Sequence, residues 1–315
     1  MSMNPQDRDH LLFFLFFCFS FMLFGIGINY GNAHPYTYVE AKTEASPPPT
    51  TEATTEAAPP ATEAATEAER PFVVVIDAGH GGVDTGSFFK PEEGKINEKT
   101  VNFKIAKYFK RALEKYDNVT VLMTRTTDKY LELVERTDFA INHDADVFVS
   151  VHNNTLVGAG GPASGSSVAV SMGNYKEEIG KKSQELGVCI SYELKKLGLK
   201  ENGLIMRSSE SYTYPNGRAA DYYATIRNVM EDEIVSVIVE HAFIDNEDDF
   251  YDFLCTKEQL KKIGEADARA VARYLQLPLK ETGKVPEALS NYKIKICHTK
   301  KNGTSKRYSK RYFKN

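Results

Sequence analysis

The chain has 315 residues, a length typical of one large domain or two small ones. Its net charge of −4 hides an asymmetry, because residues 35–70 are rich in glutamate whereas residues 288–315 hold nine lysines and arginines and no acidic residue. The four cysteines show no paired spacing and no Cys-x-x-Cys, so no disulfide framework is implied.

Residues 1–33 contain an apolar run from Leu11 to Ile28 in which Ser20 is the only polar residue. The run is long for the core of a signal peptide and short for a membrane span. Small residues at the end of this segment suit a signal peptidase that cleaves after Ala33. We therefore expect an exported protein, in which segment 1–33 is either a cleaved signal peptide or a retained signal anchor.

Residues 34–70 repeat Thr-Glu-Ala five times between short proline runs. A segment with so few large apolar side chains cannot offset the entropy lost on ordering. The composition predicts a disordered linker that could span on the order of 100 Å when stretched, at about 3 Å per residue.

Residues 71–277 alternate strand-like and helix-like patterns, which favours an α/β fold. We expect one catalytic domain with a mostly parallel, mixed, twisted sheet and helices on both faces. The expected strands are 72–76, 119–124, 147–152, 167–171 and 234–240. The expected helices are 96–116, 131–143, 175–197, 219–228 and 257–275.

Four chemically reactive side chains stand where expected strands end or an expected helix begins. His80 follows the first strand among glycines, Glu98 lies in the first turn of the next helix, and His152 and Glu240 close two later strands. Ligands bind at the carboxyl ends of strands in open α/β sheets. Two imidazoles and a carboxylate are the ligand set of a catalytic zinc, and a further carboxylate can act as general base.

Each of these residues also has an ordinary structural interpretation. Glu98 could compensate a helix dipole, His152 could be a hydrogen-bonded core histidine, and Glu240 could form a surface pair with His241. All of these together with an incidental His80 would be a considerable coincidence.

The motifs around these residues resemble the zinc-dependent N-acetylmuramoyl-L-alanine amidases of type 3, a catalytic domain of bacterial peptidoglycan hydrolases. The resemblance covers about Phe72 to Leu277. It is carried by Val75-Ile76-Asp77-Ala78-Gly79-His80-Gly81-Gly82-Val83-Asp84-Thr85-Gly86, Asn97-Glu98-Lys99, Leu131-Glu132-Leu133-Val134-Glu135-Arg136, Ser150-Val151-His152-Asn153-Asn154 and Ile238-Val239-Glu240-His241-Ala242-Phe243-Ile244-Asp245-Asn246.

The resemblance implies a Zn²⁺ cofactor held by His80, Glu98 and His152, with Glu240 as the catalytic carboxylate. The implied reaction is hydrolysis of the amide between N-acetylmuramic acid and L-alanine of the stem peptide. His241 departs from many members of the family, and strand alternation should point it away from Glu240, so we do not expect it to be a ligand.

Residues 278–315 are interpreted as a basic C-terminal tail. If the protein is an exported wall enzyme, such a tail would bind anionic wall polymers or a membrane surface. We do not expect it to bind nucleic acid. A solvated disordered tail is the equally weighted alternative. Besides the peptidoglycan substrate no further partner is indicated, and we expect a monomer.

Two other functions stay open. A zinc peptidase that cuts stem-peptide bonds would use similar residues. A non-catalytic wall-binding or activator protein could keep the same fold, but such proteins lose a ligand or the catalytic glutamate, and all four positions are filled here.

Overall fold

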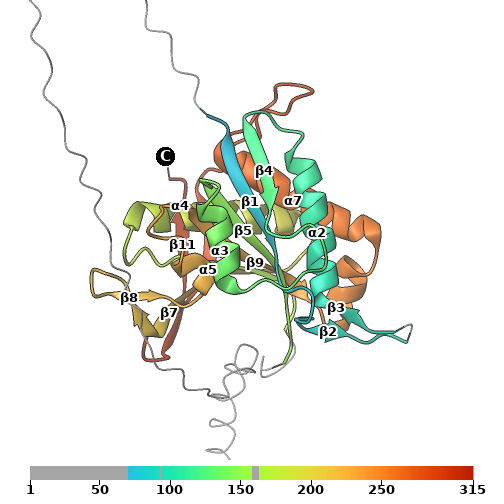
Figure 1. Ribbon diagram of the computed structural model, residues 1–315, viewed down its shortest axis with the longest axis horizontal. Helices are drawn as coiled ribbons and strands as arrows, with labels where there is room; N and C mark the ends of the chain where they lie inside the picture. Colours follow the sequence, from blue (N-terminus) through green and yellow to red (C-terminus); the bar gives the residue numbers. More distant parts are fainter. Residues whose placement is uncertain (1–69, 93, 158–162, 315) are drawn as a thin grey trace, which may run out of the picture.

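The computed structural model describes residues 70–92, 94–157 and 163–314 (Figure 1). The expected signal segment 1–33 and the expected linker 34–70, apart from Arg70, lie outside the described residues, so both stay predictions. Within the described ranges, no helix is both long and apolar enough to cross a membrane.

A mixed, nine-stranded sheet forms the centre of the fold, in the order β11-β10-β7-β6-β9-β5-β1-β4, with β8 beside β7. Its strands are β1 (Phe72–Ala78), β4 (Val119–Met123), β5 (Val147–Asn154), β6 (Ser166–Val170), β7 (Glu201–Thr213), β8 (Ala219–Asp221), β9 (Val235–Phe243), β10 (Tyr292–Thr299) and β11 (Ser305–Tyr312). The short strands β2 (Phe88–Phe89) and β3 (Ile96–Asn97) pair separately.

Strands β4, β1, β5 and β9 are parallel neighbours, so their carboxyl ends meet at one edge of the sheet. β6 runs antiparallel to β9, and β7 and β10 follow the direction of β6. The amino ends of β6, β7 and β10 therefore lie at the same edge as the carboxyl ends of the parallel group. The mostly parallel, mixed sheet expected from the sequence is confirmed.

Helices cover both faces of the sheet, as expected. One face packs against α2 (Glu98–Leu113), α4 (Glu177–Lys196) and α7 (Lys257–Leu275), and the other lies under α3 (Leu133–Ile141) and α5 (Ala224–Arg227) (Figure 1). Alternate residues of β1 enter the two cores, with Val74 and Ile76 on the α2 side and Val75 on the α3 side. Two short helical segments, α6 (Glu247–Asp249) and the π-helix η2 (Phe250–Leu254), follow β9.

The helix expected over residues 219–228 is only partly present. Residues 219–221 form β8, and the helix is limited to α5. The reason lies in Asp221, whose buried carboxylate accepts hydrogen bonds from Ser171 Oγ, the Met172 N–H and Tyr214 Oη at 2.8–2.9 Å. These bonds hold the chain extended where its sequence pattern favours a helix.

The boundary expected at residue 277 is wrong, because the segment treated as a basic tail forms β10 and β11 of the central sheet. β10 pairs in parallel with β7, with Ile296 opposite Leu204, and β11 pairs antiparallel with β10. Ile294 and Ile296 are buried, and Tyr312 Oη donates to Gln184 Oε1 of α4 at 2.7 Å. The folded domain therefore extends to the last described residues.

Candidate metal centre

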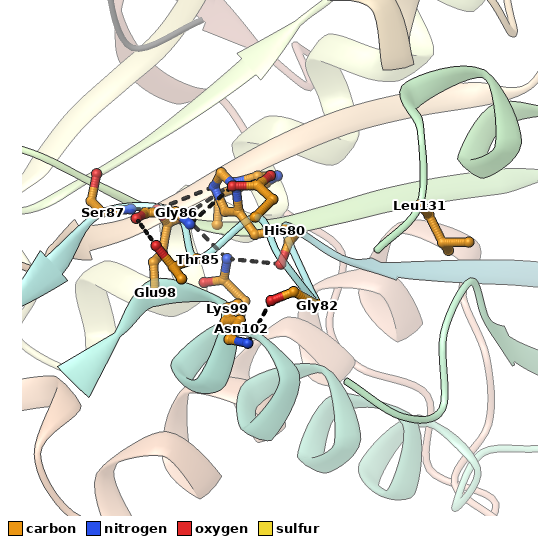
Figure 2. A network of polar contacts seen from close by, with 12 residues as sticks. His80, Gly82, Thr85, Gly86, Ser87, Glu98, Lys99, Asn102 and Leu131 are labelled. Atoms are coloured by element: carbon orange, nitrogen blue, oxygen red, sulfur yellow. Dashed lines mark hydrogen bonds and ion pairs between the residues drawn. The ribbon is translucent and has the colours of Figure 1, made fainter. Parts of the chain in front are cut away.

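His80 stands two residues after the end of β1, in a left-handed backbone conformation with φ of 59°. Its Nδ1 lies 2.8 Å from Asp84 Oδ2, which leaves Nε2 facing Glu98 Oε2 at 3.2 Å (Figure 2). The guanidinium of Arg136 donates to the carbonyl oxygen of His80 at 3.1 Å and holds the turn in place. The imidazole is thus fixed on one side by a carboxylate, as histidine ligands of metals commonly are.

Glu98 is the first residue of α2, and its side chain is almost fully buried. Oε1 accepts hydrogen bonds from Asn102 Nδ2 and from the Asn153 N–H, both at 3.1 Å, and Oε2 accepts from the Ser87 N–H at 3.0 Å (Figure 2). The carboxylate is therefore oriented by donors from three separate segments of the chain.

His152 completes the group from the neighbouring strand β5. Its Nδ1 lies 3.2 Å from Glu98 Oε1, and its ring stands edge-on to that of His80, with centroids 4.9 Å apart. One ligand atom from each of His80, Glu98 and His152 can be chosen so that all three lie within 4.8 Å of one another. The structure thus brings together the three residues singled out as ligands in the sequence, in a group that could hold a metal ion.

The electrostatics of this group favour a bound cation. Burial alone would raise the pKa of Glu98, but the imidazoles of His80 and His152 outweigh it and hold that pKa well below its ordinary value. Burial alone would lower the pKa of His80, but Glu98 and Asp84 raise it to about 10. Without a metal, the carboxylates therefore hold a proton on His80. A divalent cation in the His–Glu–His group would compensate the charge of Glu98 and displace a proton from Nε2 of His80, while Nδ1 would keep its contact with Asp84.

Glu240 lies on β9 directly opposite His152 of β5, and the side chains of such a pair share one face of the sheet. Its residue surface is partly exposed, but its Oε2 atom is buried and has no hydrogen-bond partner among the described residues. Burial raises the pKa of Glu240, and the nearby Glu98 adds to the effect, although His152 and His80 oppose it. An unpartnered buried carboxylate oxygen is costly unless a further group binds there.

Two glycines of the loop after β1 lie against the ligands. A Cβ at Gly79 would stand 2.2 Å from His152 Nε2, and a Cβ at Gly86 would stand 2.6 Å from Glu98 Oε2 and 2.7 Å from His80 Cδ2. Gly86 also has a φ of 61°, which disfavours other residues. These glycines make room for the ligand side chains themselves.

The carboxyl end of β1 is held by buried charged groups. Arg136 Nη1 and Asp77 Oδ1 form an ion pair at 2.7 Å, and both side chains are almost fully buried. Thr124 and Ser150 donate to the same carboxylate at 2.6 and 2.7 Å. The Arg125 guanidinium donates to the carbonyl oxygens at positions 78 and 79, which completes the support of the loop that carries His80.

His241 points away from the group, as strand alternation predicted. It is fully buried on the opposite face of β9, with Nδ1 2.9 Å from the carbonyl oxygen of His152 and Nε2 3.0 Å from Asp267 Oδ2. It lies outside the His–Glu–His group found among the described residues. Its contact with the carbonyl oxygen of His152 supports the backbone of that residue from the opposite face of the sheet.

Sequence reasoning missed three residues that orient the side chains of the His–Glu–His group, namely Asp84, Asn102 and Asn153. Asn102 carried a usable signal, because it follows Glu98 by four residues and so shares its helix face. Asp84 and Asn153 carried none, since their contacts depend on the loop and on the approach of β5 to α2. The Arg227 guanidinium has a structural role in α5, because its Nη1 donates to the backbone carbonyl oxygens of residues 221 and 222 at 3.0 and 2.9 Å.

An open α/β sheet with a partly buried His–Glu–His group at the carboxyl ends of its parallel strands defines a hydrolase-like α/β domain with a candidate metal centre. Residues 74–273 match the family described as N-acetylmuramoyl-L-alanine amidase. The chain therefore belongs to the N-acetylmuramoyl-L-alanine amidase family, whose members act on bacterial peptidoglycan.

Individual relatives agree with this membership. The chain is 32% identical over 216 residues to the endolysin of Bacillus phage SPP1, which covers 68% of this chain and 70% of the endolysin. It is 39% identical over 88 residues to the sporulation-specific N-acetylmuramoyl-L-alanine amidase of Bacillus subtilis, covering 28% of this chain and 33% of that protein. The solved catalytic domain of CwlV, an N-acetylmuramoyl-L-alanine amidase from Bacillus (Paenibacillus) polymyxa var. colistinus, is similar with a TM-score of 0.50 and 26% identity, covering 65% of this chain and 98% of that one.

Proposed function

We propose that this protein is a zinc-dependent amidase that hydrolyses the bond between N-acetylmuramic acid and L-alanine of the peptidoglycan stem peptide. The observation that carries the proposal is the group of His80, the buried Glu98 and His152, beside the unpartnered carboxylate oxygen of Glu240. Membership of the amidase family supplies the bond to be cut.

The donor set fits zinc. Two imidazole nitrogens and one carboxylate oxygen leave a coordination position for water or substrate, which is the arrangement of catalytic zinc sites. In this proposal His80 contributes Nε2, His152 contributes Nδ1, and Glu98 contributes a carboxylate oxygen. When bound, the ion would lower the pKa of water and polarise the scissile carbonyl.

The remaining steps belong to the chain's own residues. Glu240 takes the proton of the attacking water and later delivers it to the departing amine of L-alanine. The raised pKa of Glu240 suits both roles, since a group that first accepts and then donates a proton works best when its pKa lies near the working pH. Asp84 and the donors on Glu98 keep the ligands from rotating while charge moves through the site.

The experiment is a digest of purified peptidoglycan, read by mass spectrometry, with the protein as isolated, after chelation, and after chelation followed by added Zn²⁺. The proposal expects free stem peptides with an L-alanine amino terminus, their loss on chelation, and their return with zinc. Products cut within the stem peptide would favour a zinc peptidase instead. Intact peptidoglycan in all three samples would favour a non-catalytic wall-binding protein.

A further inference from the structure

The hairpin of β10 and β11 lies outside the 74–273 range of the family match, yet it extends the same sheet that carries Glu240. In the sheet register, Glu240 stands opposite Ser167 of β6, and Ser167 stands opposite Gly203 of β7. A Cβ atom added to Gly203 would lie 3.0 Å from the Cβ of Lys295 on β10. Side chains in cross-strand register share a face of the sheet. Lys295 therefore stands on the face of the sheet that also presents Glu240.

Four exposed cations gather on this face of the hairpin, and we call them the cationic face: Lys293 and Lys295 of β10 with Arg307 and Arg311 of β11. The alternate residues of the hairpin point the other way. Among these, Tyr312 and Lys310 bond to Gln184 of α4. The hairpin is thus anchored by one face, and the four cations of the other face are exposed.

Nothing in the described chain neutralises the cationic face. Lys293 and Arg311 stand directly opposite each other in the antiparallel register, a like-charge pair that destabilises a sheet. No acidic residue follows position 287, and none of the four cations forms an ion pair with a described residue. Repulsion of this kind is relieved when an anion binds across the strands.

The opposite flank of the metal group has different chemistry. It carries the exposed apolar side chains of Val83, Leu133 and Val134, together with the carboxylates of Asp84 and Asp128. Both carboxylates are already paired, Asp84 with His80 and Asp128 with Lys99. What this flank offers a ligand is therefore its exposed apolar side chains, which suit an uncharged sugar, whereas the hairpin attracts carboxylates. The bond cut in the proposed reaction joins a sugar to an acidic peptide, so the two flanks match the two halves of the substrate.

From these observations we propose that the cationic face binds the carboxylates of the peptidoglycan stem peptide and sets its direction across the sheet, with the glycan on the α3 side. This inference rests on the proposed function. β10 and β11 lie three and four strands from β9, which is about 14 and 19 Å at about 4.8 Å per strand spacing. A stem peptide of four or five residues spans roughly 13–17 Å when extended, so its distal carboxylates reach β10 and stop about 2 Å short of the β11 backbone, a gap within the length of an arginine side chain.

The test compares two soluble muropeptides, one with free peptide carboxylates and one with those carboxylates amidated. The variant is Lys295→Gln with Arg307→Gln, and each substitution is also made alone. The control is Lys306→Gln, which removes one exposed charge from the other face of β11. Thermal melting checks that each variant folds.

We expect KM for the acidic muropeptide to rise about threefold to tenfold in the double variant, with kcat unchanged, because each exposed charge contact contributes modestly. KM for the amidated muropeptide should not change, and the control should behave like the wild type. Salt should weaken binding of the acidic substrate to the wild type more than to the double variant. An equal change for both substrates, or no change, would overturn the inference.

Direct titration of the free acidic stem peptide separates this inference from the proposed reaction. If the wild type cuts neither muropeptide but binds the peptide through Lys295 and Arg307, the reaction is wrong and the cationic face stands. If the double variant keeps its KM and loses binding only to purified phosphate-rich wall polymer, or to vesicles of 30% phosphatidylglycerol in phosphatidylcholine, the face serves that partner and the inference is overturned.

Discussion

Replacing Gly79 by alanine should remove the metal while leaving the metal-free fold nearly unchanged. The new Cβ would lie 2.2 Å from His152 Nε2, whereas ordinary contacts begin near 3.4 Å. The ring would have to move by about 1.2 Å, the difference of those two distances, while ligand distances in a working site agree to within about 0.2 Å. His152 would therefore leave its contact with Glu98, and one of three ligands would be lost.

The expected effect is a fall in zinc affinity of more than about 100-fold, because even the loss of an outer-shell partner costs about 10- to 100-fold. The fold itself should be spared, since Gly79 does not need a positive φ and the obstructing group is a side chain that can rotate. Replacing glycine in a compatible conformation changes stability by about 0.4–1 kcal/mol, in the stabilising direction.

Zinc affinity is measured by competition with a chromophoric chelator, and stability by thermal melting of the chelated protein. Gly187→Ala is the matched control, because a Cβ there would meet Val170 Cγ1 at 2.6 Å in the core, far from the metal group. The control should lose stability and keep its zinc affinity. Wild-type zinc affinity in the Gly79 variant would refute the reasoning, since His152 would then not be needed where the structure places it.

Three further substitutions test the site and its support. His80→Ala should no longer hold zinc after dialysis, as measured by atomic emission, and one ion per chain in this variant would exclude His80 as a ligand. Glu240→Gln should keep one zinc per chain and lose about 10²- to 10⁴-fold in the rate of muropeptide cleavage, so near-normal activity would contradict its role as general base. Burial alone would raise the pKa of Asp77, but Arg136 outweighs this effect and lowers that pKa below its ordinary value of 3.8. The ion pair of Asp77 with Arg136 therefore stabilises the fold fully at neutral pH, and this contribution to the free energy of unfolding is lost as the pH falls through and below 3.8. Asp77→Asn should therefore lower the free energy of unfolding by about 3–5 kcal/mol at pH 7, because it leaves Arg136 buried without its partner. In the variant, the free energy of unfolding from urea melts should also fall less steeply in acid. Curves of unfolding free energy against pH that run parallel for variant and wild type would contradict this.

The parallel half of the sheet could be read from the sequence because its strands are buried on both faces. β1, β5 and β9 are nearly continuous apolar runs, and the reactive residues that end or follow them stand out for that reason. The same rule predicts that His80, His152 and Glu240 lie at one edge of the sheet.

Apart from β6, which matches the expected strand 167–171, the other half of the sheet could not be read in this way. β7 ends in exposed polar residues, and β11 has one buried residue, Tyr312, among lysines and arginines. Such strands are stabilised by backbone pairing with a neighbouring strand and by a few side-chain hydrogen bonds to α4. Neither kind of interaction produces an alternating apolar pattern in the strand's own sequence. The residues that orient the ligands escaped for a similar reason, since Asn153 acts through its backbone N–H.

The pairing of β10 with β7 also determines where the chain can be shortened. A protein cut at residue 277, where the apolar pattern ends, would expose the hydrogen-bonding groups of β7 along a flat strand edge and uncover the buried side chain of Leu204 beside it. Unpaired edges of that kind recruit strands from other molecules and lead to aggregation. With the hairpin present, the strand at this end of the sheet is β11, whose closely spaced positive charges oppose pairing with the β11 edge of a second copy.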